Sequence, residues 1–115
     1  MAEYSFAHVG INSANEEEAR KAAGLLNLLF GLPVKEGNSS IFVSDGIEVY
    51  KTPYLGTPGH IAIATPDVEA ARAELEAKGY PCDPDTAKYK PDGTLNAIYL
   101  TGEIGGFAVH LVKKP

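Results

Sequence analysis

Residues 59–81 read GHIAIATPDVEAARAELEAKGYP, and a longer form of the same pattern occurs near the start of the chain. Both copies open with a histidine, a branched residue, a small residue and a second branched residue, as His8–Ile11 and as His60–Ile63. Alternation with a period of two is typical of a β-strand. The sequence therefore predicts two copies of one unit, each led by a strand.

A helical pattern follows each opening strand. An Ala-Arg pair stands at the same offset from each histidine, at 19–20 and at 71–72. Each pattern then ends in glycine and proline, as Gly31-Leu32-Pro33 and as Gly79-Tyr80-Pro81. A glycine past the last turn, with a proline soon after it, is the usual end of a helix. Both units are therefore expected to continue from strand to helix.

The helix starts are predicted from capping residues. Ser13 with Glu16 has the spacing of a capping box, and Thr65 followed by Pro66 suits an N-cap and a first helical position. The acidic run at 16–18 complements the positive end of the helix dipole. We therefore assign this acidic run no functional role.

Further strand patterns follow each helix. In the first half they cover about 34–35, 40–43 and 46–52, with a turn at 44–46; in the second half they lie near Cys82 and at 95–100 and 107–113, with turns at 91–93 and 102–106. Both halves thus read β-α-β-β-β, over about 5–52 and 58–113. Neither half can bury its own sheet face, so the two should pair. The prediction is one α+β domain of two tandem modules.

Composition excludes several classes of protein. The chain has 115 residues, a net charge of −5 and a single cysteine, Cys82. This size fits one domain, the negative charge argues against nucleic-acid binding, and one cysteine excludes an internal disulfide or a multi-cysteine zinc site. The start shows no signal-peptide pattern, and the most apolar window, 22–32, is too short to span a bilayer. We expect a cytoplasmic protein with neither nucleic-acid nor membrane partners.

Four ionisable side chains occupy matching places in the two halves. The opening strands hold His8 and His60. The last strands hold Glu48 and His110, and each of these two lies between two apolar branched residues. A lone strand histidine is more often a core or surface residue than a metal ligand, and Glu48 alone could face solvent. All three histidines of the chain nevertheless fall on these repeat-related positions. The joint pattern favours a metal site made by His8, Glu48, His60 and His110.

Three imidazoles and one carboxylate suit one divalent ion of Zn, Ni, Co, Mn or Fe. On an octahedral ion, four protein ligands leave two adjacent positions open. A substrate with two neighbouring oxygens could occupy both positions, and the ion could then stabilise a developing enolate or oxyanion.

These residues resemble the vicinal oxygen chelate superfamily, the fold of glyoxalase I, bleomycin-resistance proteins, methylmalonyl-CoA epimerase and extradiol dioxygenases. The resemblance rests on the paired β-α-β-β-β units, the phrase Gly59–Ile63 and the four candidate ligands, and it covers about 6–113. It implies a curved mixed sheet and a metal held by His8, Glu48, His60 and His110.

A narrower resemblance concerns residues 37–42, 53–56 and 105–110. They are similar to a domain found in bacterial proteins described as 2-dehydro-3-deoxyphosphogluconate or 4-hydroxy-2-oxoglutarate aldolases. Those aldolases use a lysine on an α/β barrel, which needs about 200 residues or more. This chain is too short for such a barrel, so the resemblance implies an accessory domain and points to 2-oxo acids or sugar acids as ligands.

One departure from the family pattern limits the chemistry. Most metal-binding members place a glutamate where this chain has His110, which leaves Glu48 as the only carboxylate of the set. Glu48 is then the first candidate base, with Tyr50 and Tyr99 as candidate acids or substrate contacts. Both tyrosines could equally serve as strand packing.

The leading hypothesis is a metal-dependent isomerase, epimerase or lyase that acts on a small oxo compound through an enolate. A non-catalytic binding or regulatory module of the same fold is the alternative.

Glyoxalase I activity requires a glutathione site, which this sequence does not display. Extradiol ring cleavage needs three open positions on iron, and four protein ligands leave only two. Lys51 and Lys88 are candidate contacts for an anionic group, although surface lysines are common. A homodimer is expected, because a small half-open sheet leaves apolar surface to cover.

Overall fold

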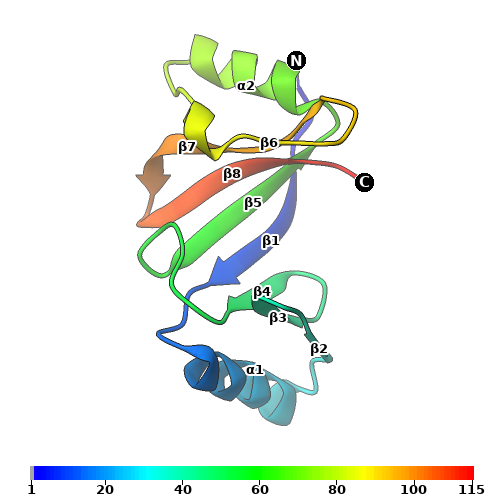
Figure 1. Ribbon diagram of the computed structural model, residues 1–115, viewed down its shortest axis with the longest axis vertical. Helices are drawn as coiled ribbons and strands as arrows, with labels where there is room; N and C mark the ends of the chain where they lie inside the picture. The colour runs from blue at the N-terminus through cyan, green and yellow to red at the C-terminus, as the bar shows by residue number, and fades with distance from the viewer. Residues whose placement is uncertain (1) are drawn as a thin grey trace.

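The computed structural model describes residues 2–115 as one curved, mixed sheet of eight strands with two helices (Figure 1). The first half contains β1 (Ser5–Ile11), α1 (Glu16–Phe30), β2 (Val34–Glu36), β3 (Ser40–Val43) and β4 (Ile47–Tyr50). The second half contains β5 (Gly59–Thr65), α2 (Val68–Ala77), the 3₁₀ turn η1 (Pro84–Thr86), β6 (Lys88–Tyr89), β7 (Leu95–Ile104) and β8 (Phe107–Lys113). This order matches the α+β fold expected from the repeat.

The two halves join through the two strands that open them. The sheet order is β2-β3-β4-β1-β5-β8-β7-β6, so β1 and β5 lie side by side at the centre and are antiparallel. Each also pairs in parallel with the last strand of its own half, β1 with β4 and β5 with β8. The four strands that hold the candidate ligands are therefore the four central strands.

Both helices cover the same face of the sheet. Helix α1 packs on β3 and β4 through Ala19 and Ala23, which form one buried cluster with Val49 and other branched residues. Helix α2 packs on β7 and β8 through Val68 and Ala71. Residues that pair across neighbouring strands share a face, and strand side chains alternate between faces. The apolar alternation thus assigns one face to the helices and leaves the other for the polar residues.

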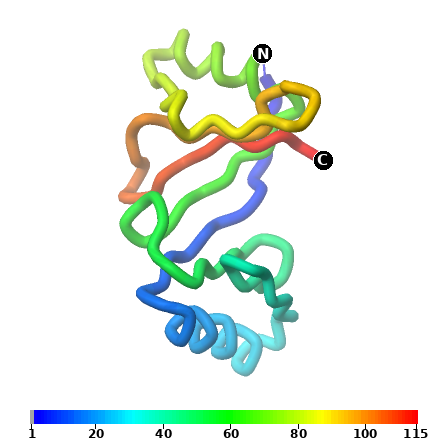
Figure 2. Tube along the Cα trace, viewed as in Figure 1, coloured from blue at the N-terminus to red at the C-terminus, as the bar shows by residue number. Residues whose placement is uncertain are grey.

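Strand β1 connects the two ends of the molecule. Its start lies near α2, where the Ala2 backbone N–H donates to Glu74 Oε1 over 3.1 Å, and its end leads directly into α1 (Figure 2). The chain measures 44 × 26 × 25 Å, with the two helices at opposite ends of the long dimension. A single strand therefore fixes the first half against the second.

Both helix starts differ from the prediction. The N-cap of α1 is Asn15, whose side chain accepts from the Glu18 N–H over 2.9 Å, instead of Ser13. The N-cap of α2 is Asp67 instead of Thr65. Thr65 is still paired with Lys113 as the last residue of β5, so its backbone serves the sheet. Several capping residues stand in a row at each start, and the tertiary pairing determines which one caps the helix.

The strand predictions for the second half were wrong in two places. Cys82 forms only an isolated bridge with Leu100, and the edge strand is β6 at Lys88–Tyr89. Strand β7 also runs on to Ile104 across part of the expected turn at 102–106. An irregular register between Tyr99 and Glu103 lets it bend and continue its pairing with β8.

The described residues include no helix that is long and apolar enough to cross a bilayer. The expected homodimer stays a prediction. Large apolar side chains of α1 that such a dimer could cover are exposed: Leu25, Leu28, Leu29 and Phe30.

Gly24 and Gly31 provide a matched test of the helix assignment. Gly24 lies inside α1, and a Cβ built there meets no neighbouring atom within 4 Å. Gly24→Ala is therefore expected to raise the free energy of unfolding by about 0.5–1 kcal/mol, since alanine loses less backbone entropy in a helix. Urea denaturation measures this change.

Gly31→Ala is the control, because its Cβ site is also free of neighbours but its φ is +70° at the helix C-cap. An L-residue there is strained, so stability should fall by about 1 kcal/mol. Equal effects of the two substitutions would contradict the assigned end of α1.

Candidate metal centre

His8, Glu48, His60 and His110 converge on the face of the sheet opposite the helices. Gly10 of β1 pairs with Glu48 on one side and with His60 on the other. Ala62 of β5 likewise pairs with His8 and with His110. Because partners in register share a face, all four side chains point the same way from four adjacent strands. The four residues come from one chain, so no partner subunit is needed to bring them together.

The distances between their polar atoms fit a single ion. His8 Nε2 lies 3.2 Å from His60 Nε2 and 3.4 Å from Glu48 Oε1, and His60 Nε2 lies 3.9 Å from the same Oε1. One nitrogen from each of the three histidines lies within 4.8 Å of the other two. Ligand atoms at about 2.0–2.2 Å from a metal are about 3–4 Å apart. Three imidazoles and a carboxylate at these separations fit the donor set of a divalent transition metal.

Gly10 makes room for the His60 ring. A Cβ at this position would lie 2.0 Å from His60 Cε1, closer than any real contact. The ring therefore occupies the space that a side chain at residue 10 would need, and His60 is only 1% exposed. The small residue of the opening pattern in the first half thus has a specific task, because it lets the histidine of the second half reach the site.

Burial keeps two of the three imidazoles neutral. Desolvation lowers the pKa of His60 to about 4, and the nearby His8 lowers it further. The pKa of His110 is also lowered to about 4, first by burial and then by His60. A neutral imidazole has a free lone pair, which is the form that binds a metal. His60 Nδ1 is buried with no hydrogen-bond partner in residues 2–115, so a protein hydrogen bond does not explain its burial.

One carboxylate oxygen of Glu48 accepts a hydrogen bond from the protein, and the other faces the histidines. Ser40 Oγ, on the neighbouring strand, donates to Glu48 Oε2 over 2.8 Å, and Ser40 is buried. Oε1 is left facing His8 and His60. A carboxylate fixed in this way presents a single oxygen to an ion, and the serine orients it. No sequence pattern singles out Ser40, because a serine at the start of a strand is common.

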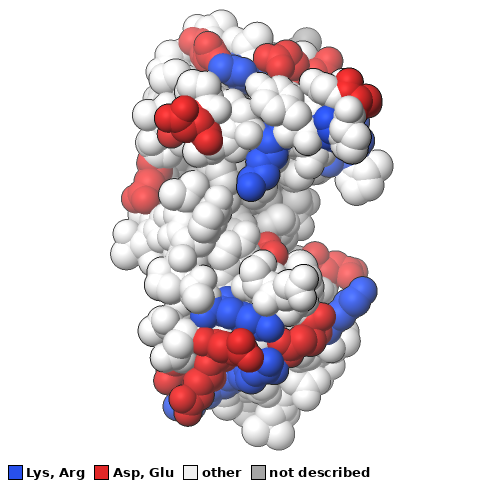
Figure 3. Space-filling model, viewed as in Figure 1, with Lys and Arg blue, Asp and Glu red and all other residues white. Residues whose placement is uncertain are grey.

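A cavity of about 370 Å³ opens beside these residues, where the space-filling view shows the molecule hollowed between the lobe of α2 and the lobe of α1 (Figure 3). Its lining is mostly hydroxyl and aromatic side chains with three of the candidate ligands: His8, Ser39, Glu48, Tyr50, Thr52, Tyr54, Thr86, Lys88, Ala97, Tyr99 and His110. His60 is buried beneath the floor. A small molecule in this space would lie against the candidate metal centre.

Both predicted tyrosines line the cavity and touch the histidines. The Tyr50 ring centroid lies 5.2 Å from that of His60, and the Tyr99 centroid lies 4.6 Å from that of His110. Burial raises the pKa of Tyr50 to about 12, with a contribution from Glu48. Burial also raises the pKa of Tyr99, by a larger amount. Both hydroxyls therefore keep their protons at neutral pH and can donate hydrogen bonds.

Tyr54 also lines the cavity, although sequence reasoning gave it no role. Its ring lies 5.6 Å from that of Tyr50 and 6.2 Å from that of Tyr99. Tyr54 belongs to the linker between the halves, and Asn12 holds that linker by donating to the carbonyl oxygens of Tyr54 and Gly56. A strand pattern cannot reveal a linker residue that folds back over the sheet.

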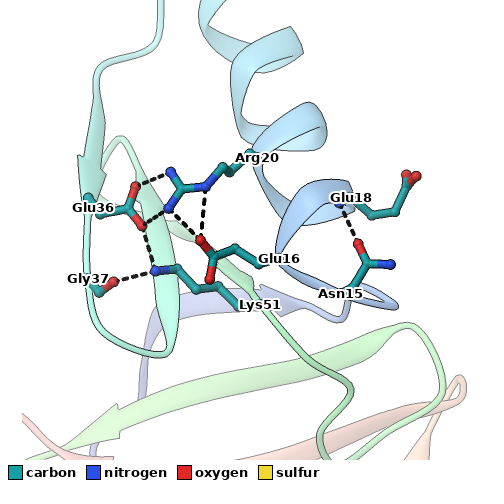
Figure 4. A network of polar contacts seen from close by, with 7 residues as sticks. All are labelled: Asn15, Glu16, Glu18, Arg20, Glu36, Gly37 and Lys51. Carbon is teal, nitrogen blue, oxygen red and sulfur yellow. Dashed lines mark hydrogen bonds and ion pairs between the residues drawn. The ribbon is translucent and has the colours of Figure 1, made fainter.

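The two predicted lysines lie in different environments. Lys88 of β6 lines the cavity, whereas Lys51 does not. Lys51 Nζ contacts Glu36 at 2.5 Å and donates to the Gly37 carbonyl over 2.9 Å. Glu36 also binds Arg20, which binds Glu16, so the cation of Lys51 belongs to a network that ties α1 to β2 (Figure 4).

Neither a protein-family model nor a curated protein sequence matches the chain. Solved structures do. Methylmalonyl-CoA epimerase from Mycobacterium tuberculosis has a TM-score of 0.67 at 17% identity, over 96% of this chain and 87% of the epimerase. A hypothetical protein from Bacillus halodurans has a TM-score of 0.69 at 16% identity, over 98% and 96% of the two chains. The fold is glyoxalase-like.

Homoprotocatechuate 2,3-dioxygenase from Arthrobacter globiformis is also similar, with a TM-score of 0.59 at 14% identity. The match covers 95% of this chain but only 35% of the dioxygenase. The epimerase and the dioxygenase both have the vicinal oxygen chelate fold. Identities this low establish the fold alone, and the comparisons do not show the narrower resemblance to an aldolase-associated domain.

The geometry predicts one metal equivalent per chain. Metal-free protein titrated with Co²⁺, Ni²⁺ or Zn²⁺ should saturate at one ion, and the melting temperature should rise with metal concentration because the ion binds only the folded state. His110→Ala should weaken binding strongly. Gly10→Ala should weaken it by about 10–100-fold, because the added Cβ displaces the His60 ring.

Isothermal titration calorimetry and the visible absorption of Co²⁺ report this binding, and circular dichroism checks that each variant is folded. Gly24→Ala is the matched control, since it adds the same methyl group far from the site. Unchanged affinity in both His110→Ala and Gly10→Ala would contradict a metal centre at these residues.

Proposed function

We propose that this protein binds one divalent metal through His8, Glu48, His60 and His110 and acts as an epimerase, isomerase or lyase. Its substrate would be a small oxo compound with two vicinal oxygens, of the 2-oxo acid or sugar-acid type, and the reaction would pass through an enolate. The observation that carries the proposal is the convergence of three imidazoles and one carboxylate beside a cavity. The facing atoms of His8, Glu48 and His60 lie 3.2–3.9 Å apart, and one nitrogen of His110 lies within 4.8 Å of those of the other two histidines.

A bound divalent ion supplies Lewis-acid stabilisation of negative charge on the substrate oxygens. The protein supplies the rest of the chemistry. The cavity would bring the substrate against the metal-binding residues, with Tyr50, Tyr54 and Tyr99 in its lining. Tyr50 and Tyr99, both protonated at neutral pH, offer hydrogen bonds to an oxygen that gains charge as the proton leaves carbon.

Glu48 is the residue we assign to proton transfer. It is the only carboxylate in the lining of the cavity as described, and Ser40 holds its Oε2 so that Oε1 faces the ligand space. A base must lie within hydrogen-bond reach of the proton that it removes, and Oε1 is already positioned at the cavity wall. With one carboxylate available, Glu48 would take the proton from carbon, and Tyr50 or Tyr99 would donate the proton that returns on the opposite face in an epimerase.

The alternative is a non-catalytic binding or regulatory module of the same fold, such as an accessory domain to a 2-oxo-acid aldolase. The absence of a second carboxylate from the described cavity lining favours it, because a tyrosine whose pKa is raised is a weaker proton donor than a carboxylic acid. The two hypotheses differ in whether the protein exchanges a carbon-bound proton of its ligand. They also differ in the metal, because less than a tenth of an equivalent of any transition metal after reconstitution would favour the binding module.

Proton exchange with solvent separates these hypotheses. Metal-loaded protein incubated with 2-oxo acids in D₂O should cause loss of the proton signal at the carbon next to the oxo group, followed by NMR. Glu48→Gln should slow this exchange by about 100-fold or more, since general-base catalysis contributes factors of about 10²–10⁴.

Glu36→Gln is the control, because Glu36 is an exposed carboxylate outside the cavity lining. Ligand binding without exchange in the unaltered protein would favour the binding module. Exchange that survives Glu48→Gln would remove Glu48 from its assigned role.

A further inference from the structure

The cavity beside the candidate metal centre is lined by one acidic and one basic side chain, which do not form an ion pair with each other. Glu48 is the only acidic residue and Lys88 the only basic residue of its described lining. Within residues 2–115, Lys88 takes part in no ion pair, whereas Lys51 is neutralised by Glu36. Lys88 is therefore a cation that faces a ligand space without a protein counterion.

The local structure holds Lys88 in place. Its strand β6 pairs with β7 through Lys88 and Ala97. Just before it, Thr86 Oγ1 donates to the Asp83 carbonyl over 2.7 Å and accepts from the Tyr99 N–H over 2.9 Å. The segment that carries the lysine is thus fixed to the same strand that places Tyr99 against His110.

The position of Lys88 in the sheet sets the length of ligand that could reach it. His110 lies on β8 and Lys88 on β6, with β7 between them. Neighbouring strands are about 4.8 Å apart, and Lys88 is in register with Ala97 and, beyond it, with Val112, two residues past His110. The Lys88 and His110 backbones are therefore about 12 Å apart. Both side chains reach toward the cavity, which leaves room for a few atoms of ligand between the metal-facing nitrogen and the ammonium group.

The charge of the loaded cavity indicates the charge of its ligand. This inference rests on the metal site proposed above. A divalent ion contributes two positive charges, the three imidazoles are neutral ligands, and Glu48 cancels one charge. Lys88 adds one positive charge at the other wall. The loaded cavity therefore has an excess of two positive charges, which a ligand with two negative charges would balance.

We propose that the natural ligand is a small dianion, a 2-oxo acid with a second anionic group. Its carboxylate and oxo oxygens face the metal ligands, and its distal anionic group pairs with Lys88. Lys88 is then the residue that determines specificity for the distal group. A cavity of about 370 Å³ lies at the small end of ligand pockets and suits a ligand of this size.

Three probes of equal chain length test the proposal on the full-length, Co²⁺-loaded protein. The probes are 2-oxoglutarate, with a distal carboxylate; 2-oxo-4-phosphonobutanoate, with a distal phosphonate; and 2-oxopentanoate, with no distal charge. Calorimetry gives the affinities, and the Co²⁺ absorption spectrum reports whether each probe reaches the ion. The tighter of the two dianions identifies the distal group as carboxylate or phosphate-like.

Lys88→Gln should weaken binding of the dianions by about 5–10-fold, as expected for a partly exposed ion pair in a cleft, and should leave 2-oxopentanoate within about twofold. Lys90→Gln is the matched control, because Lys90 lies two residues away and outside the described cavity lining. It should change none of the affinities. Added salt should weaken dianion binding more than binding of 2-oxopentanoate.

Equal affinity of the unaltered protein for all three probes, or an equal loss for all three in Lys88→Gln, would overturn the role of Lys88. If Co²⁺ and 2-oxopentanoate still bind and shift the spectrum in that case, the metal site stands and only this inference fails. Failure of the protein to bind any Co²⁺ would overturn both proposals together.

Discussion

The antiparallel pairing of β1 with β5 is the contact on which the candidate site depends. It places Gly10 opposite His60 and Ile11 opposite Gly59, so two glycines lie where the halves meet. A Cβ on Gly59 would lie 1.7 Å from the Gly10 carbonyl oxygen, and a Cβ on Gly10 would strike the His60 ring. The backbones approach closely here because neither glycine has a side chain. This approach brings one half's His8 and Glu48 within reach of the other half's His60 and His110.

The same contact buries the imidazoles, and burying them lowers the free energy of unfolding unless they bind a ligand. His60 and His110 are almost completely buried, and burial lowers the pKa of each to about 4, so the fold excludes their charged forms. Without a metal, the 3.2 Å contact between His8 and His60 can satisfy one N–H, and His60 Nδ1 remains unpaired. A buried polar atom without a partner costs about 1–3 kcal/mol. Buried imidazole nitrogens that the surrounding protein leaves unpaired are typical of a centre whose function requires those groups.

The repeat made much of the fold predictable from sequence. Strand alternation and the two glycine–proline stops gave the element order, and the matching positions gave the four converging side chains. Residues whose place depends on tertiary contacts could not be assigned in this way. Thr65 is a good capping residue, but its pairing with Lys113 keeps it in β5. Lys51 stands beside Tyr50 in sequence, yet Glu36 draws its side chain away from the cavity. Tyr54 reaches the site only because Asn12 holds the linker backbone.

The presence of His110 in place of a second carboxylate links the chemistry to the ligand. A divalent ion with two carboxylates would leave a neutral centre, whereas one carboxylate and three imidazoles leave one positive charge. The more positive centre stabilises an enolate more strongly, because a negative charge that develops beside it is less opposed by ligand charge. The same exchange removes a base, so the proposed proton transfer would rely on Glu48 and the protonated tyrosines. Such a centre stabilises negative charge more strongly but has fewer bases. It therefore favours a ligand with acidic carbon-bound protons and a high negative charge. Lys88, at the opposite wall of the cavity and without an ion-pair partner in residues 2–115, favours the same ligand.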